Sequence, residues 1–147
     1  MTTVFWVCAG LLVYTYFLYP GLLWLFTAGR RVTRPDEPVE WPAISVVIAA
    51  YNEALVIRDK LENALSLEYP GRLQIVVVSD CSDDATDEIV KEFVERGVVL
   101  ERTAHRSGKT AAQNAGVNRA NGDVLVFSDA NSMYDMAALK ELVRALE

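Results

Sequence analysis

The sequence has few of the residues that build disulfide frameworks and zinc sites, with two cysteines and one histidine in 147 residues. Cys8 lies in an apolar run and Cys81 lies far from it, so neither kind of framework is indicated and a reducing compartment fits. Basic residues are also in the minority, 14 against 20 acidic ones, for a formal net charge of −6. This acidic balance argues against a nucleic-acid partner, which would require a basic face.

Charge of either sign is absent from residues 4–29, VFWVCAGLLVYTYFLYPGLLWLFTAG. The run exceeds the roughly 20 residues that a helix needs to cross a bilayer. A signal peptide would carry basic residues ahead of the run, and the sequence has none there. Tryptophan and tyrosine are spread along the run and Pro20 can kink it, so a buried or partly re-entrant helix is the alternative.

Three arginines, Arg30, Arg31 and Arg34, follow this run, and no basic residue precedes it. The positive-inside rule then predicts that the chain beyond the run faces the cytoplasm. We therefore expect residues 1–31 to form a single-pass transmembrane anchor with a basic flank in the plasma (inner) membrane. Residues 32–42, rich in proline and acid, are predicted to form an extended linker.

The remaining residues, 43–147, alternate short apolar runs with helical patterns. Strands are predicted at residues 44–50, 73–79, 98–100 and 123–128. Helices are predicted at residues 55–67, 84–96, 111–120 and 135–146. This alternation is typical of βαβ units, so we predict an α/β domain with an open, mainly parallel sheet and flanking helices.

Apolar spacing predicts which faces of two of these helices are buried. The residues expected to face inward are Leu55, Ile57, Leu61, Ala64 and Leu65 in the first helix, and Ile89, Val90, Phe93 and Val94 in the second. Acidic residues at the start of the second helix, Asp83, Asp84 and Asp87, are expected to serve its N-terminus. Cys81 precedes them and is of interest for its backbone conformation.

Polar residues follow the predicted strands, where ligands of open parallel sheets bind. Tyr51, Asn52 and Glu53 follow the first strand, and Asp80 follows the second. Asp129-Ala130-Asn131 follows the fourth. No Gly-x-Gly-x-x-Gly motif follows any of these strands, which argues against a dinucleotide-binding domain.

The segment RSGKT, residues 106–110, ends like the phosphate-binding loop of many nucleotide hydrolases. That motif needs an earlier glycine so that the loop turns tightly, and Thr103 stands at that position. Lys109 therefore needs another explanation. A cation at the start of a helix suits a phosphate-bearing ligand, because the helix N-terminus also favours negative charge.

Four motifs, SVVIAAYNEA, VVVSDCSDDATD, GKTAAQNAG and GDVLVFSDANS, resemble in order and spacing those of family-2 glycosyltransferases of the A fold. The resemblance runs from Ala43 to the end of the chain, and the anchor before it looks like that of the membrane-bound branch. It implies transfer of a sugar, with inversion, from a nucleoside-diphosphate sugar to a glycan or lipid-linked acceptor. The donor it implies is a UDP-sugar.

The resemblance also implies roles for single residues. Tyr51, Asn52 and Glu53 would edge the nucleoside, and Asp80 would accept a hydrogen bond from the base. Lys109 would lie near the nucleotide. Asp129 and Asn131 fall where the family carries Asp-x-Asp, which holds Mg²⁺ or Mn²⁺ against the diphosphate.

Two features depart from the family pattern. Asn131 replaces the second carboxylate and brings no negative charge, which bears on metal affinity. The family's later carboxylate base and Gln-x-x-Arg-Trp segment are not found after Asn131, so we expect the donor-binding half of an enzyme, with its catalytic base elsewhere. A membrane-tethered nucleotide-sugar-binding fragment without catalysis is the alternative. A nucleotidyltransferase would carry a glycine-rich, basic signature after its first strand, which AAYNEA lacks.

Overall fold

The computed structural model describes residues 1–29, 38 and 40–146. The chain divides into two compact units, residues 1–34 and residues 35–147, and each is described by itself. Arg30, Arg31 and Arg34, which carried the prediction of orientation, lie outside the described residues. So does most of the predicted linker, residues 32–42.

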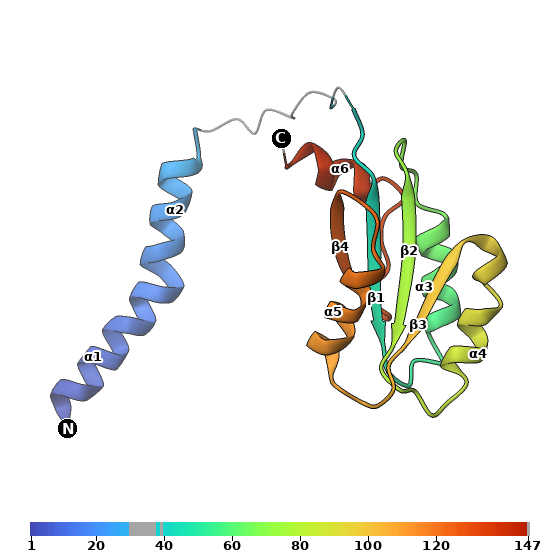
Figure 1. The fold of residues 1–147 in the computed structure, drawn as a ribbon. Coiled ribbons are helices and arrows are strands. Elements are labelled where there is room, and N and C mark those ends of the chain that lie inside the picture. The colour runs from blue at the N-terminus through green and yellow to red at the C-terminus, as the bar shows by residue number, and fades with distance from the viewer. Residues whose placement is uncertain (30–37, 39, 147) are drawn as a thin grey trace. The chain divides into compact units, whose positions relative to one another are not determined.

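The N-terminal unit is one run of helix made of α1 (Thr2–Val13), a π-helical turn (Tyr14–Leu18) and α2 (Tyr19–Thr27) (Figure 1). Thr2–Thr27 has 26 residues and a mean hydropathy of 1.5, so its length and composition suffice to cross a membrane. The π turn lies just before Pro20, and the Tyr19 N–H donates to the Tyr14 carbonyl five residues back. A wider turn relieves the contact between a proline ring and the carbonyl four residues earlier.

The second unit contains a four-stranded sheet in the order β3-β2-β1-β4. Its strands are β1 (Ile44–Ala50), β2 (Leu73–Ser79), β3 (Val98–Arg102) and β4 (Val124–Asp129). Every pairing is parallel, which confirms the predicted α/β fold. The predicted third strand was two residues too short, because Glu101 and Arg102 extend β3 along β2.

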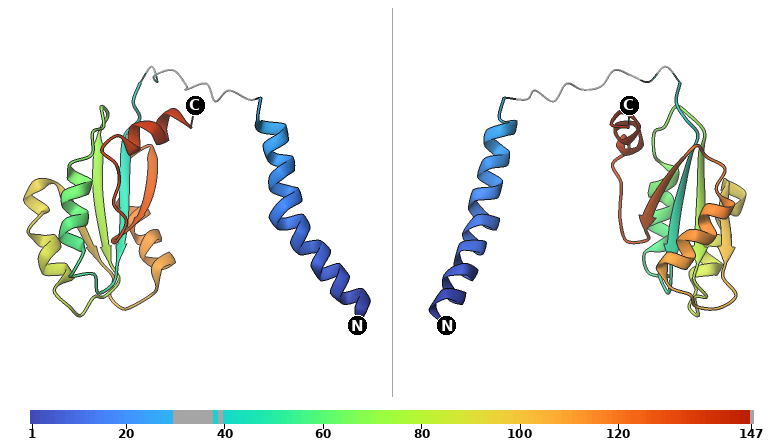
Figure 2. Two further views of the ribbon diagram at one scale, coloured as in Figure 1. Left: turned by 180° about the vertical axis from the view of Figure 1, so that it is seen from behind. Right: turned by 60° about the vertical axis from the view of Figure 1, so that its left-hand side comes forward.

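Helices cover both faces of this sheet (Figures 1 and 2). They are α3 (Ile57–Leu65), α4 (Thr86–Lys91), α5 (Lys109–Arg119) and α6 (Ala138–Arg144). The larger core cluster joins alternate residues of β1 to α3, α4 and α6, and includes Ile48, Leu61, Val90 and Leu139. The smaller cluster lies on the opposite face, where Val47, Val76 and Val78 pack against Ala112 of α5. β1 is therefore buried on both sides, as its β-branched sequence predicts.

Three details of the helix predictions were wrong. Leu55 is 97% exposed, because α3 begins only at Ile57 and Leu55 lies in the turn before it. Val94 is 49% exposed, because α4 ends at Lys91 and a short 3-10 helix, Val94–Arg96, follows before Gly97 turns the chain with a φ of 93°. Asp87 does not cap α4, since its carboxylate pairs with Arg102 at the end of β3.

The prediction for Asp84 is confirmed, since its carboxylate accepts the N–H of Thr86 at the start of α4 at 2.9 Å. It also accepts the Ala54 N–H at 3.1 Å. Burial acts to raise the pKa of Asp84, but its bonds to Thr86 and Ala54 outweigh burial and hold the pKa below the usual value. Asp84 therefore ties the loop after β1 to the loop after β2. Cys81, in the loop after β2, has the expected unusual backbone with a φ of 59°.

Gly116 lets α5 approach the sheet closely. A Cβ atom at this position would lie 2.3 Å from Cγ1 of Val47 and 3.0 Å from Cγ2 of Val78. These distances are shorter than any ordinary carbon–carbon contact, which is about 3.5–4.0 Å. The absence of a side chain at Gly116 thus sets the distance between α5 and β1, and with it the position of the helix N-terminus.

Candidate functional site at the carboxyl ends of the strands

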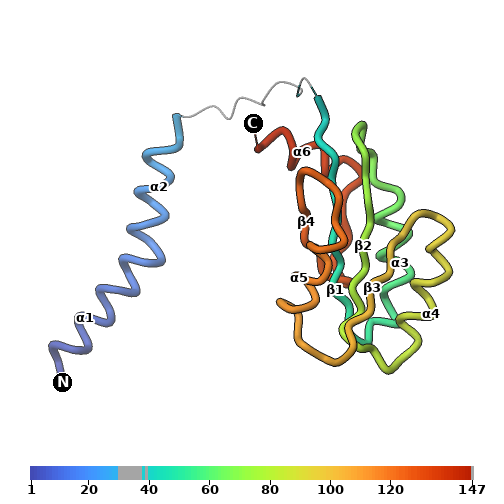
Figure 3. The backbone as a smooth tube through the Cα atoms, in the orientation of Figure 1, coloured from blue at the N-terminus to red at the C-terminus, as the bar shows by residue number. Residues whose placement is uncertain are grey.

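The loops that follow the strands gather at the lower end of the sheet (Figure 3). Ala50 pairs with Ser79, and Ala49 pairs with Asp129, so the loops after β1 and β2 and the end of β4 lie at the same level. A cleft of about 390 Å³ opens there, a size typical of small-molecule sites. Its polar lining residues are Tyr51, Glu53, Asp80, Arg106, Lys109, Asp129 and Asn131.

Asp80 is the most enclosed acid of the cleft, with 4% of its surface exposed. One carboxylate oxygen accepts the Ser107 N–H at 2.8 Å and the Thr103 hydroxyl at 3.1 Å. The other accepts the Gly108 N–H at 2.7 Å. Burial acts to raise the pKa of Asp80, but these bonds and the charge of Arg106 outweigh burial and keep the pKa below the usual value. Asp80 is therefore ionised at neutral pH.

These bonds shape the start of α5. Gly108 has a φ of 87°, a conformation that glycine adopts without strain, and directs its N–H toward Asp80. The carboxylate has about four acceptor positions, and three are used by Thr103, Ser107 and Gly108. One position remains for a ligand. The first N–H groups of α5 have no partner within the helix, so they can meet an anion in the cleft.

Lys109 and Asp129 face each other across the cleft. The Lys109 Nζ lies 2.6 Å from a carboxylate oxygen of Asp129, and both side chains are about half exposed. Asn131 lines the cleft two residues beyond Asp129. The structure thus brings the two predicted metal ligands and the predicted phosphate-binding cation into one place.

Tyr51 and Arg106 also line the cleft and contact each other. The Arg106 guanidinium lies over the Tyr51 ring, 4.1 Å from its centroid. Glu53 also lines the cleft. Asn52 does not, since its side-chain oxygen accepts the Asp83 N–H at 3.0 Å and its backbone N–H donates to Ser82 at 3.2 Å. Asn52 has a φ of 54°, and its two hydrogen bonds to Ser82 and Asp83 stabilise the turn after β1.

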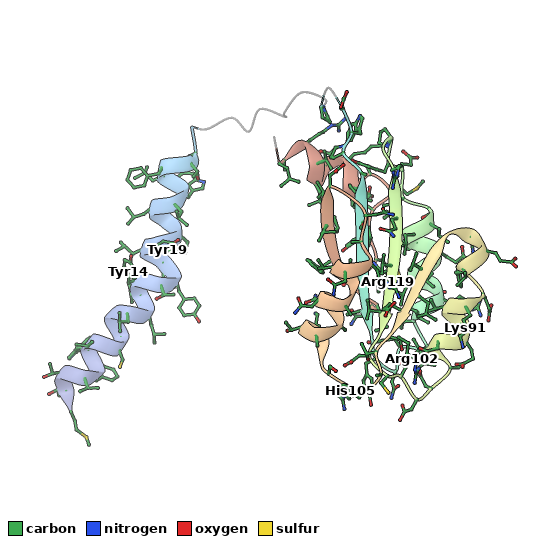
Figure 4. All side chains as sticks on the ribbon, viewed as in Figure 1. Tyr14, Tyr19, Lys91, Arg102, His105 and Arg119 are labelled. Carbon is green, nitrogen blue, oxygen red and sulfur yellow. The ribbon has the colours of Figure 1, made fainter. Side chains whose placement is uncertain are left out.

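Two residues of this region were missed from the sequence. Arg106 is the first residue of RSGKT, and a second basic residue three positions before the lysine at the helix start was a usable signal. Lys60 is fully buried at 0% exposure, and it occupies an inward position of α3 between Ile57 and Leu61. A charged residue on an otherwise apolar helix face was the signal there. His105, on the loop between β3 and α5, is exposed at the same end of the sheet (Figure 4).

Lys60 contacts the segment that follows Asp129. Its Nζ donates to the Ser132 carbonyl at 2.5 Å and lies 4.0 Å from the centroid of the Tyr134 ring. One turn along α3, Asn63 donates to the Tyr134 carbonyl at 2.9 Å and accepts the Tyr134 N–H at 2.8 Å. Burial lowers the pKa of Lys60 to about 8, against the opposing effect of the Asp129 charge.

The arrangement suits an anionic ligand with a planar group, because Lys109 and the N-terminus of α5 favour negative charge and the Tyr51 ring can stack on a flat group. Oxygen donors of the kind that Mg²⁺ and Mn²⁺ prefer are present in Asp129 and Asn131. No group of three or more His, Cys, Asp or Glu side chains able to hold a metal occurs among the described residues. Two oxygen donors suit a cation that takes its remaining ligands from phosphate and water, which is how Mg²⁺ is commonly bound. A parallel α/β domain with a ligand cleft at its strand ends is the class of protein that these features define.

Comparison with known proteins identifies the family. The model of glycosyl transferase family 2 matches residues 45–147, so the chain belongs to that family. It is 36% identical over 143 residues to the probable glycosyltransferase YdaM of Bacillus subtilis, covering 92% of this chain and 34% of the relative. It is 35% identical over 126 residues to the poly-beta-1,6-N-acetyl-D-glucosamine synthase of Staphylococcus epidermidis, covering 82% of this chain and 30% of that protein. The chain spans about a third of the length of these relatives.

Two solved structures have the same fold. One is the mannosyltransferase PcManGT from Pyrobaculum calidifontis in complex with GDP-Man and Mn²⁺, with a TM-score of 0.79, 29% identity and coverage of 94% of this chain and 43% of that one. The other is S. aureus TarS 1-349 in complex with UDP-GlcNAc, with a TM-score of 0.64, 25% identity and coverage of 69% of this chain and 30% of that one. The predicted A-type fold is confirmed by these neighbours.

Proposed function

We propose that this chain supplies the donor-binding part of a glycosyltransferase that uses a nucleoside-diphosphate sugar, with UDP as its nucleotide. One observation carries the proposal: Tyr51 and Asp80 directly after β1 and β2, Lys109 at the start of α5 and Asp129 at the end of β4 line a single cleft. The solved neighbours hold GDP-Man or UDP-GlcNAc, so a nucleotide sugar is the ligand class that the fold supports.

The nucleoside lies near Tyr51 and Asp80 in this proposal. Asp80 has one free acceptor position, and an ionised acceptor makes a shorter and stronger bond to a ring N–H than a neutral one does. A uracil base offers such an N–H. Tyr51 offers a ring face, which Arg106 now covers, and Glu53 borders the same region.

The diphosphate lies between the N-terminus of α5 and Asp129. Lys109 and the free N–H groups of the first turn of α5 would bind its oxygens. Asp129 and Asn131 would hold a divalent cation, which supplies positive charge against the leaving diphosphate when bound. Lys109 pairs with Asp129 at 2.6 Å, so a cation on Asp129 would release Lys109 toward the phosphate.

The proposal includes transfer with inversion to a glycan or lipid-linked acceptor. Inversion by direct displacement needs a base to take the proton of the acceptor hydroxyl, and we assign that role to no residue of this cleft. The synthase relative is named for a polysaccharide, poly-beta-1,6-N-acetyl-D-glucosamine, and a polysaccharide product is the acceptor class that this name supports.

We also propose that Thr2–Thr27 anchors the chain in the plasma membrane with the domain in the cytoplasm. The helix is long and apolar enough for this role, and the arginines at positions 30, 31 and 34 favour the cytoplasmic side by the positive-inside rule. A cytoplasmic domain would meet nucleotide sugars where cells make them.

Calorimetry with the full chain in detergent micelles tests donor binding. We expect UDP to bind more tightly than GDP or CDP, and Mn²⁺ to increase the affinity for UDP. In Asp129→Ala the Mn²⁺ effect should disappear while binding in EDTA persists, because Asp129 is the only carboxylate of the proposed pair. A wild-type protein indifferent to Mn²⁺ would refute the metal site. Binding of UDP-sugars without any turnover, also in a C-terminally extended chain, would favour the non-catalytic alternative.

A further inference from the structure

The contacts of Lys60 raise a question about its charge. A lysine with 0% exposure is rare in proteins, because removing an ammonium group from water is costly unless strong partners replace the water. Its direct contacts are the Ser132 carbonyl and the Tyr134 ring, and the charge of Asp129 favours its ammonium form without outweighing burial. A methionine would fill the same space without that cost. The presence of a lysine therefore calls for an explanation other than packing.

Both partners of Lys60 belong to the segment that carries the proposed metal ligands. Ser132 follows Asn131 directly, and the Ser132 N–H donates to the Asp129 carbonyl at 3.3 Å, which closes a tight turn from Asp129 to Ser132. The hydrogen bond from Lys60 holds the far end of this turn. The two Asn63 bonds to Tyr134 hold the residues that follow. One face of α3 thus fixes the segment from Asp129 to Tyr134 at two points, one in the turn and one just after it.

We propose that Lys60 is a positioning residue for Asp129 and Asn131. By binding the Ser132 carbonyl from beneath the turn, it holds the two oxygen donors where a divalent cation and a donor diphosphate can meet them. Asn63 assists from the same helix face. This inference rests on the proposed function, since it assigns a role in the same site.

Loss of the Lys60 charge and loss of its positioning role predict opposite changes in metal affinity. An ammonium near Asp129 repels a divalent cation at the same carboxylate, so its removal by itself would strengthen metal binding. Loss of a partner that orients a metal ligand weakens metal affinity, typically by about 10- to 100-fold. Weaker binding in a neutral variant can therefore come only from lost positioning. The sign of the change separates the two effects.

Lys60→Met is the variant of choice, because methionine is unbranched and keeps an apolar stem of similar length. The quantity to measure is the Mn²⁺ enhancement, defined as the ratio of the UDP association constant with Mn²⁺ to that in EDTA. Calorimetry on the full chain gives both constants. The enhancement should fall by about tenfold in Lys60→Met, at the low end of the range for lost orienting partners. Affinity in EDTA should change little. Thermal unfolding checks that the variant is folded, because relief of a costly buried charge and loss of the bond to the Ser132 carbonyl act on stability in opposite directions.

Two further variants complete the test. Asn63→Ala removes both bonds to Tyr134 and should also reduce the Mn²⁺ enhancement, and it decides the question if Lys60→Met does not fold. Glu62→Gln is the matched control on the exposed face of α3, where Glu62 pairs with Arg96, and it should leave the enhancement unchanged.

The outcomes distinguish this inference from the proposed function. If wild-type protein shows no UDP binding or no Mn²⁺ enhancement, the proposed function is wrong in that respect and takes the inference with it. A wild-type enhancement that survives or increases in folded Lys60→Met overturns the positioning role alone. The same holds if Lys60→Met is unfolded and Asn63→Ala keeps the full enhancement.

Discussion

At the scale of single residues, the site depends on a buried acid that serves both the fold and the ligand. Asp80 holds the backbone of Ser107 and Gly108 and still has one acceptor position. Hydrogen bonds to an ionised group contribute about 1.5–3 kcal/mol each, more than neutral ones. The charge of Asp80 therefore stabilises the turn before α5, and the same charge is what a base N–H would meet.

Asp80→Asn should weaken UDP binding by at least about tenfold, which corresponds to about 1.4 kcal/mol. The amide keeps one acceptor oxygen, but its NH₂ group replaces the other oxygen and faces either the Gly108 N–H or the Ser107 N–H and Thr103 hydroxyl, which are themselves donors. Calorimetry in EDTA measures the loss without metal. Thr103→Val, which removes only the 3.1 Å bond to the same carboxylate, is the control and should lose less. Equal affinity in Asp80→Asn and wild type would rule out the assigned role.

Acid titration gives a second readout of Asp80. Its pKa is lower in the folded protein than in the unfolded chain, so its contribution to stability is present above the ordinary carboxyl pKa of about 3.9. That contribution is lost as the pH falls through the lower, folded pKa. The difference in unfolding free energy between wild type and Asp80→Asn should thus be constant above about pH 5 and shrink below pH 4. Denaturant titrations at several pH values measure this difference.

At the scale of elements, the position of α5 decides where Lys109 lies. The helix packs on Val47 and Val78 at a distance that only a glycine at position 116 permits. Its first residue, Lys109, then faces Asp129 across the cleft. The close contact of Gly116 with the sheet thus sets both the packing of α5 and the place of Lys109 in the cleft.

Gly116→Ala should destabilise the domain by about 1–3 kcal/mol, the usual cost of an extra methyl group in a packed core. Helix propensity acts in the opposite direction by up to about 1 kcal/mol, so the net sign tests the close contact. Asn114→Ala, on the exposed side of α5, gains propensity without the clash and should be neutral or stabilising. A Gly116→Ala protein as stable as wild type would contradict the close packing. Denaturant unfolding is the measurement.

The elements also indicate how far sequence reasoning reaches. β1 and β2 were placed to the residue, because uninterrupted β-branched runs bounded by polar residues have few other interpretations. Leu55 was misplaced because apolar spacing extends past the true start of a helix, and bonds within the turn at Glu53 and Val56 set that start. The cleft residues followed from the rule on strand ends. Lys60 did not, because only the contact across 72 positions to Ser132 shows what it binds.

At the scale of the whole molecule, the chain joins an apolar helix to an acidic domain. All of the acidic residues lie from Asp36 onward, and none lies in Thr2–Thr27. The two cysteines fall one in each unit, Cys8 in α1 and Cys81 in the loop after β2. They are therefore natural probes of where each unit lies.

A membrane-impermeant maleimide should label Cys81 in inside-out vesicles and spare it in right-side-out vesicles, because the proposed orientation places the domain in the cytoplasm. Cys8, within the bilayer, should react in neither, since an impermeant reagent does not enter the apolar layer. Cys81→Ser is the control that assigns the label by mass spectrometry. Labelling of Cys81 only in right-side-out vesicles would contradict the proposed orientation. Extraction of the chain from membranes by carbonate would contradict the proposed anchor.

The bonds from Asp80 to Ser107 and Gly108 have a consequence for ligand fragments. The acid proposed to meet the base accepts hydrogen bonds of 2.8 and 2.7 Å from Ser107 and Gly108, the two residues just before the helix proposed to meet the diphosphate. If a uridine fragment orders this turn, pyrophosphate loses less binding free energy to the conformational entropy of the turn. By thermodynamic linkage, bound pyrophosphate then increases the affinity for the uridine fragment by the same factor. The two halves of the nucleotide would then bind as cooperative partners, each improving the other's affinity without touching it.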